Sequence, residues 1–233
     1  MSATRTAPHK GKGRNKASNA RDRKAAKRSP VLPIALGLFV LLAIVAVVVS
    51  RGGGDDGSTA GDDGASAIEQ TRPVQVTGTS LADFEAGNDT AVGTTAPVLQ
   101  GQTFDGASIT IGKAGDPQVV FFVAHWCPHC QKEVPVISEW IADKGIPQGV
   151  SLYGVSTGVN KSAPNYPPSR WLDREDWPVR TLADDERGTA AKAYGLTGYP
   201  FFVAIDGDGE VVARASGELS VEQIEALVDA ARR

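Results

Sequence analysis

The stretch HWCPHCQKEVP, residues His125 to Pro135, contains both cysteines of the 233-residue chain. Two cysteines are too few for the disulfide framework of a small secreted scaffold. Only two residues separate Cys127 from Cys130, so they act as one local pair. Three interpretations are open at this point: a structural disulfide, a pair of metal ligands, or a redox couple.

A strand, a helix and a second strand are predicted around this pair. The continuous apolar run Val119 to Ala124 directly precedes it and is typical of a strand buried on both faces. Apolar residues then recur at helical spacing as far as Lys144, where Gly145 is expected to end the helix. Gly149 to Ser156 is another apolar strand. A strand, helix and strand in this order predict a parallel βαβ unit.

The flanking segments predict further elements. A hairpin is expected within Gly93 to Gly112, with its turn at Asp105-Gly106. In the later, polar stretch, helices are expected over Ser169 to Glu175 and over Asp185 to Tyr194. A second hairpin, of Pro200 to Ile205 and Glu210 to Ala215, and a last helix capped by Ser220 complete the chain. The fold class is therefore α/β: a mixed central sheet flanked by helices, with an N-terminal hairpin extension.

The first 66 residues differ in composition from the rest. Residues 1–30 hold ten Lys or Arg and one Asp, and residues 31–49, Val31 to Val49, are uncharged and long enough for a single transmembrane helix. This run is longer than the apolar part of a cleaved signal peptide. Residues 50–66 are rich in Gly, Asp and Ser, as in a flexible linker, and residues 67–233 form the folded domain.

The basic tail predicts the topology. Because Lys and Arg gather on the cytoplasmic side of a membrane segment, we expect a single-pass protein of the cell membrane with a cytoplasmic N-terminus and an extracytoplasmic domain. The position of the tail beside this segment favours contact with anionic lipid, and we expect no binding of nucleic acid.

The motifs of the domain resemble a known family. CPHCQKEVP matches the CxxCxxExP signature of the membrane-anchored, thioredoxin-fold proteins of the TlpA and ResA group, and YGLTGYPFFVAIDGDGEVVARASGEL supports the match. The resemblance runs from Gly93 to the C-terminus. It implies a thioredoxin-like fold and a thiol–disulfide oxidoreductase, with Pro200 at the position of the family's cis-proline and Tyr199 as a substrate-binding residue.

The chemistry of thiol–disulfide exchange assigns roles to the pair. Cys127 at the N-terminus of a helix has a stabilised thiolate, so it is the predicted nucleophile. Cys130, one turn further, is the predicted resolving thiol, and the two form the redox disulfide Cys127–Cys130. Pro128 and His129 between them are expected to tune the reduction potential. Trp126 is expected to lie partly exposed beside the site and, like Tyr199, to be a substrate-binding residue.

The chain also departs from the thioredoxin pattern. Thioredoxins place a buried Asp six residues before the first cysteine, where this chain has Phe121. Glu133, on the same helical face as Cys130, is a candidate proton acceptor. An exposed surface carboxylate is the equally weighted alternative for Glu133.

Other kinds of site fit the sequence less well. His125 and His129 are potential metal ligands beside the cysteines, but the only other histidine is His9 in the basic tail, so no metal and no cofactor are expected. A metal-binding chaperone remains a lesser alternative. Gln131 breaks the CxxCH pattern of haem attachment, and Ala124 stands where a peroxidase of the peroxiredoxin type has Thr or Ser. A structural disulfide over so short a loop would stabilise little.

The direction of electron flow is the main alternative left open. Pro128-His129 is the dipeptide of the bacterial oxidase DsbA, whereas the surrounding signature belongs to reductases. The first hypothesis is reduction of disulfides in exported proteins, for example in cytochrome c maturation, with a membrane electron donor. The alternative is oxidation of the thiols of exported proteins.

Overall fold

A five-stranded mixed sheet forms the centre of residues 68–233, the part of the chain that this computed structural model describes. The strand order is β6-β5-β4-β7-β8, with β4 parallel to β5 and β5 parallel to β6. The pairs β4–β7 and β7–β8 are antiparallel. The bounds are β4 Gln118–Val123, β5 Ser151–Ser156, β6 Arg180–Ala183, β7 Phe201–Ile205 and β8 Val211–Ser216.

The central strand β4 is buried along its whole length, as its continuous apolar run predicts. It leads through a short loop into α2 (Pro128–Lys144), which returns the chain to the parallel strand β5. The predicted βαβ unit is confirmed. Since both strands end at the same edge of the sheet, the loop that contains Cys127 lies at this edge beside the end of β5.

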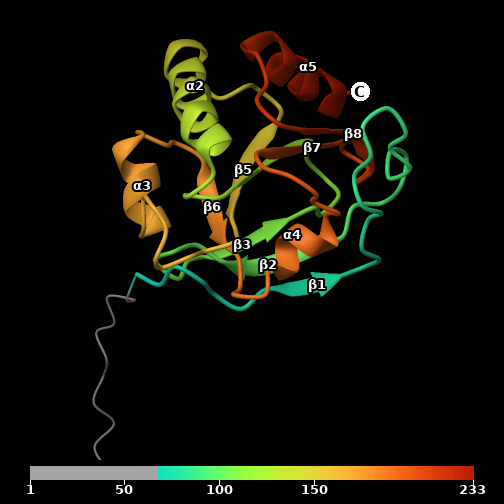
Figure 1. Cartoon of the computed structure of the whole chain (residues 1–233). Helices are drawn as coiled ribbons and strands as arrows, with labels where there is room; N and C mark the ends of the chain where they lie inside the picture. The colour runs from blue at the N-terminus through green and yellow to red at the C-terminus, as the bar shows by residue number, and fades with distance from the viewer. Residues whose placement is uncertain (1–67) are drawn as a thin grey trace, which may run out of the picture. The chain divides into compact units, whose positions relative to one another are not determined.

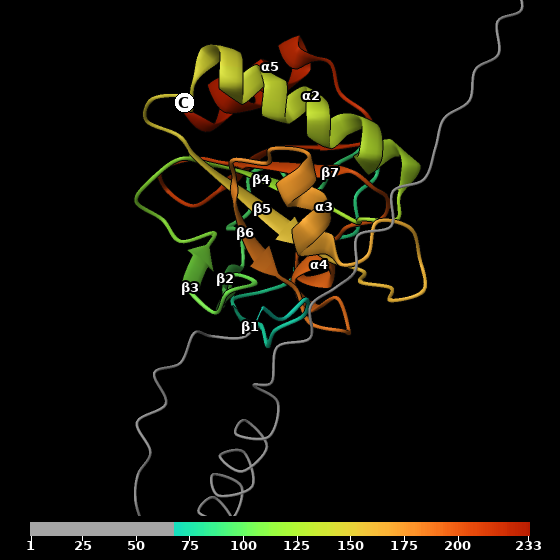
Figure 2. The same ribbon diagram turned by 90° about the vertical axis from the view of Figure 1, so that its left-hand side faces the viewer.

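Helices α2 and α5 (Val221–Ala231) cover one face of the sheet and lie side by side in Figure 2. Their apolar faces bury Ile137 and Ile224 completely, against Phe121 of β4 and Phe202 of β7. Ser220 caps α5 as predicted. Because α2 packs against the sheet in this layer, one face of the helix is buried and the opposite face is in solvent.

A small antiparallel sheet and α4 (Thr189–Ala193) cover the other face (Figure 1). The predicted hairpin is confirmed as β2 (Val98–Gln102) and β3 (Ser108–Ile111). The extension is nevertheless larger than a hairpin, because β1 (Gln75–Thr77) pairs with β2. Three residues are too short a run for sequence periodicity to reveal β1.

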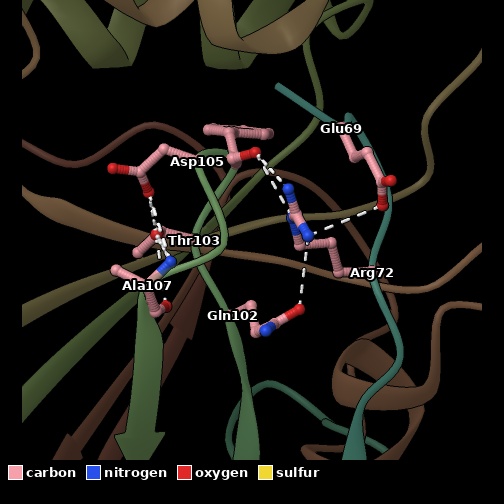
Figure 3. Close-up of polar contacts among 7 residues, drawn as sticks. Glu69, Arg72, Gln102, Thr103, Asp105 and Ala107 are labelled. Carbon is pink, nitrogen blue, oxygen red and sulfur yellow. Dashed lines mark hydrogen bonds and ion pairs between the residues drawn. The ribbon is translucent and has the colours of Figure 1, made fainter. Parts of the chain in front are cut away.

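The turn of this hairpin is joined to the stretch that precedes β1 (Figure 3). Arg72 donates to the carbonyl of Phe104 (2.9 Å) and to the side chain of Gln102 (3.3 Å). Within the turn, the hydroxyl of Thr103 donates to Asp105. These contacts attach the first described residues to the domain at the hairpin turn.

Two predictions for the region after β5 need correction. The predicted short helix is confirmed as α3 (Pro168–Arg174), but the four-residue strand β6 was missed, because RTLA is too short to show alternation. The helix predicted over Asp185 to Tyr194 begins only at Thr189. The carboxylate of Asp185 accepts from the backbone N–H of Thr189 (3.0 Å) and Gly188 has a positive φ, so the first turn is not helical.

The basic tail 1–30, the predicted transmembrane segment Val31 to Val49 and the linker 50–66 lie outside the described residues. Among the helices of residues 68–233, none is both long enough and apolar enough to cross a membrane.

Candidate active site

Cys127 lies where the loop after β4 turns into α2. Its backbone N–H donates to the carbonyl of Ala124 (3.0 Å), and it is the N-cap residue of the helix, followed by Pro128 at the first helical position. The side chain makes no capping hydrogen bond to the first turn of the helix. Both cysteines are free thiols in this structure.

The two thiols differ in depth. Cys127 is 6% exposed, whereas Cys130, one turn into the helix, is completely buried. The sulfur of Cys130 accepts from the backbone N–H of Ala124 (3.4 Å). Burial raises the pKa of the Cys130 thiol well above its usual range, and the negative charge of Glu133 adds to the increase. Of the two, only Cys127 is placed to meet a partner molecule.

Tyr199 and Pro200 lie next to Cys127, because the loop before β7 passes close to the start of α2. The Cys127 thiol donates to the carbonyl of Tyr199 (3.8 Å), and the Tyr199–Pro200 peptide bond is cis. The ring of Tyr199 meets Trp126 edge to face at 5.7 Å between centroids. Trp126 is half-buried, as expected, and its Nε1 donates to the carbonyl of Gly158 (2.7 Å). Two aromatic rings therefore flank the more accessible thiol.

Glu133 is not the surface carboxylate that was the alternative at the sequence level, since it is only 2% exposed. Its carboxylate accepts from the backbone N–H of Leu219, at 3.1 Å for Oε2 and 3.3 Å for Oε1. Burial raises the pKa of Glu133 to about 7, an effect that the Leu219 hydrogen bond partly offsets. This carboxyl group is therefore able to change its protonation state near neutral pH.

His129 points outward and pairs with a residue that the sequence did not single out. Its Nδ1 lies 2.6 Å from Oε1 of Glu218, in the loop between β8 and α5, and the same oxygen accepts from Lys132 (3.2 Å). His129 holds the pKa of Glu218 below its usual value. Glu218 lies 89 residues further along the chain, so no local sequence pattern links it to the cysteines.

His125, a potential metal ligand at the sequence level, is completely buried and has both ring nitrogens engaged. Nδ1 lies 2.7 Å from the carbonyl of Pro164, and Nε2 accepts from the backbone N–H of Asn160 (3.1 Å). Burial lowers its pKa, which agrees with a neutral ring protonated on Nδ1. Within residues 68–233, no group of three or more His, Cys, Asp or Glu side chains is arranged to hold a metal ion.

Position 121, where thioredoxins have a buried Asp, is filled by apolar packing. Phe121 is completely buried and meets Trp177 and Phe202 edge to face, each at 5.9 Å. Glu133 reaches the vicinity of Cys130 from the helix instead of from the strand.

The mixed sheet and the paired thiols at the start of α2 define a thioredoxin-like protein. The sequence profile of the AhpC/TSA family matches residues 92–214, more than half of the chain, and the chain belongs to this family. The matched region includes both cysteines, Glu133 and the Tyr199–Pro200 peptide.

The chain is similar to the thiol:disulfide interchange protein DsbE homolog of Paracoccus denitrificans, at 32% identity over 44% of this chain and 51% of that protein. It is 30% identical to the thiol-disulfide oxidoreductase ResA of Bacillus thuringiensis, over 45% of this chain and 57% of that protein. The chain spans 51–64% of the length of the first curated relatives that it matches. The solved structure of StoA from Bacillus subtilis aligns at 23% identity and a TM-score of 0.49, over 56% of this chain and 96% of that one.

Proposed function

We propose that this chain is a thiol–disulfide oxidoreductase in which Cys127 attacks and Cys130 resolves. The observation that carries the proposal is the difference in depth between two free thiols one helical turn apart, the outer one at the helix N-terminus beside the cis Tyr199–Pro200 peptide. Exchange needs one thiol that a partner's disulfide can reach and a second one sheltered from it.

The reaction then runs in two steps. The thiolate of Cys127 attacks one sulfur of a substrate disulfide, a mixed disulfide forms, and the second substrate sulfur leaves as a thiolate that takes up a proton. Cys130 loses its proton and attacks the sulfur of Cys127, which releases the first substrate sulfur. The substrate gains two electrons, and the chain is left with the disulfide Cys127–Cys130, which a membrane electron donor has to reduce again.

Glu133 is the proposed proton acceptor for Cys130. Its pKa of about 7 matches the requirement for a base that works near neutral pH, and its charge acts on Cys130. Burial also raises the pKa of the resolving thiol, so a nearby acceptor accelerates a step that would otherwise be slow.

We favour the reductive direction, on disulfides of exported proteins. The carboxylate of Glu218 next to His129 offsets the positive charge that makes a Pro-His dipeptide oxidising. The DsbE and ResA relatives are named as thiol:disulfide enzymes. Together with the predicted membrane segment Val31 to Val49, this supports an extracytoplasmic, membrane-anchored reductase of the ResA type, with apocytochrome c as one candidate substrate.

The second candidate is an oxidase of exported thiols, and the observation that favours it is Pro128-His129 itself. In that case electrons flow from the substrate to the disulfide Cys127–Cys130 and on to a membrane acceptor. The lesser alternative, a metal-binding chaperone, predicts stoichiometric metal in the purified reduced chain. The backbone hydrogen bonds on both nitrogens of His125 count against it.

Trapping of mixed disulfides tests the proposal. The full chain with Cys130→Ser, incubated with a disulfide-bonded protein, should accumulate a mixed disulfide through Cys127, because no thiol remains to resolve it. Cys127→Ser is the matched control and should trap little, since Cys130 is completely buried. Trapping by Cys127→Ser alone would reverse the two roles, and trapping by neither variant would contradict the proposed function.

A further inference from the structure

A surface loop begins directly beside the two aromatic residues that flank Cys127. This β5–α3 loop, residues 158–166, is the central part of the connection between β5 and α3. The carbonyl of Gly158 accepts from Nε1 of Trp126 (2.7 Å). A Cβ atom at Gly158 would lie 3.0 Å from the hydroxyl of Tyr199, which shows how closely the loop approaches the second ring. The loop thus borders the surface through which a partner reaches Cys127.

The ring of His125 makes two hydrogen bonds to the backbone of this loop. Its Nδ1–H donates to the carbonyl of Pro164 (2.7 Å), and its Nε2 accepts from the N–H of Asn160 (3.1 Å). Since the ring is completely buried, both bonds are shielded from water. A neutral imidazole has one donor and one acceptor, and the loop backbone uses both.

The backbone of His125 adds a third attachment. Its carbonyl accepts from Nε2 of Gln131 in α2 (3.0 Å) and from Nδ2 of Asn165 (3.4 Å). Asn165 has a positive φ and is held in turn by Arg174 of α3 (3.0 Å). His125 therefore connects the loop to the same helix that carries the two thiols.

The loop has few buried side chains that could hold it in place. Asn160, Pro164 and Tyr166 are all exposed, and no residue from 158 to 166 is fully buried. A segment with few buried apolar contacts opens at low free energy unless something else restrains it. The bonds to His125 and the one to Trp126 supply that restraint.

We propose that His125 is a positioning residue that fixes the β5–α3 loop at the border of the surface on which a polypeptide substrate lies against Cys127. The inference rests on the proposed function and adds to it a residue that determines how well a polypeptide disulfide binds. A small disulfide reaches Cys127 without touching the loop, so its reaction is independent of His125. His125 acts on the substrate only through the loop that it holds.

Two disulfides of different size test the proposal. The reduced full chain is mixed in single turnover with a disulfide-bonded peptide of about ten residues and with the small aromatic disulfide dithiobis(nitrobenzoate). For His125→Phe, which removes both ring hydrogen bonds and keeps an aromatic ring, the peptide concentration at half-saturation should rise about tenfold. The limiting rate with the peptide and the rate with the small disulfide should stay within about twofold. Equal losses on both disulfides would overturn the proposal.

Conservative variants distinguish positioning from general damage to the core. His125→Asn keeps a donor near Nδ1, and His125→Gln keeps an acceptor near Nε2, so each should restore part of the peptide affinity that His125→Phe loses. On the loop itself, Asn160→Pro removes the backbone N–H that donates to His125, at an exposed position. Asn160→Ala keeps that N–H and is its control.

The reactions of these variants and of the unaltered chain distinguish failure of the positioning role of His125 from failure of the proposed oxidoreductase function. Asn160→Pro should weaken peptide binding while Asn160→Ala does not, and identical behaviour of the two variants would contradict the role of the loop. If the unaltered chain reacts with neither disulfide, the proposed function itself fails. Normal reaction of the unaltered chain, together with unchanged peptide affinity in His125→Phe, would overturn the positioning role alone.

Discussion

At the scale of single residues, the site combines one slightly exposed thiol with several groups buried beneath it. Cys127 is held at the helix N-terminus, while Cys130 and Glu133 lie on the inner face of α2. Burial raises the pKa of both inner groups, because each charged form loses water. At neutral pH Cys130 therefore keeps its proton, whereas Glu133 is near the midpoint of its titration and is able to accept one.

Glu133 gives the fold a pH dependence of definite sign. The folded-state pKa is raised from 4.5 to about 7, so the folded form binds a proton more tightly than the unfolded chain does between these values. The contribution of Glu133 to stability is complete below about pH 4.5 and is lost as the pH rises through about 7. We compare the free energies of unfolding of Glu133→Gln and of the unaltered chain in urea. From pH 4.5 to pH 8, their difference should change in favour of the variant by roughly 3 kcal/mol at most. Parallel pH curves for the two proteins would contradict the raised pKa.

The same carboxyl group should control the resolving step. Only the ionised form accepts a proton, so the rate at which Cys130 resolves a mixed disulfide should rise as the pH passes through about 7. Rapid-quench measurement of this rate should show the rise in the unaltered chain. Glu133→Gln should resolve more slowly and lack that step in its pH profile. A Gln variant with the same profile would exclude Glu133 as the acceptor.

Glu218 should lower the reduction potential through His129. Glu218→Gln removes the negative charge that pairs with the ring, so the ring is free to donate a hydrogen bond toward Cys127 and stabilise the reduced form. We expect the equilibrium constant against glutathione to shift about threefold toward the oxidant, which is ~14 mV for a two-electron couple. The shift should vanish in a His129→Ala background. Glu222→Gln, at an exposed acidic position nearby, is the control and should have no effect.

The sequence predicts those site residues that lie close together along the chain and misses those that folding brings in. Cys127, Cys130 and Glu133 stand in one signature, and Pro200 stands in a second motif recognisable by resemblance. Glu218 and the loop contacts of His125 depend on residues 35 to 89 positions away. A buried histidine and a metal-ligating histidine look the same in a sequence, because only tertiary structure decides what each ring nitrogen meets.

At the scale of elements, long apolar segments were predictable and short ones were not. The runs of β4, β5 and α2 are long enough for their periodicity to outweigh local exceptions, even with Pro135 inside α2. The strands β1 and β6 are three and four residues long and depend on pairing with neighbours. The first turn of the helix predicted at Asp185 is lost because side-chain hydrogen bonds compete with the helical ones.

Helix α5 covers the same face of the sheet as α2, which carries the two thiols. Its N-terminal cap should contribute measurably to the free energy of unfolding. Ser220 Oγ accepts from the N–H of Gln223 (3.3 Å), and the side chain of Gln223 accepts from the N–H of Ser220 (2.8 Å). Ser220→Ala should lower the free energy of unfolding by about 1 kcal/mol in urea titrations. Ser220→Asp keeps an acceptor and should lose less than half as much. Equal stability of all three proteins would show that the cap is unimportant.

At the scale of the whole molecule, the first 30 residues are strongly basic and the rest of the chain is acidic. Residues 1–30 hold ten Lys or Arg against one Asp, whereas the other 203 residues hold 14 basic and 26 acidic residues. A basic tail before an apolar segment and an acidic domain after it is the distribution expected of a membrane-anchored protein. We propose that the redox domain works on exported proteins and exchanges electrons with a partner in the membrane.

The reduction potential of the Cys127–Cys130 couple in the full chain decides whether the protein is a reductase or an oxidase. Equilibration with dithiothreitol or glutathione buffers, followed by alkylation of free thiols, measures the oxidised fraction. For a reductase, we expect a reversible two-electron transition near about −270 mV, the value of thioredoxin. A potential near about −120 mV, the value of DsbA, would contradict the reductive direction. Failure of the two thiols to form a disulfide at any potential would contradict the assignment as an oxidoreductase.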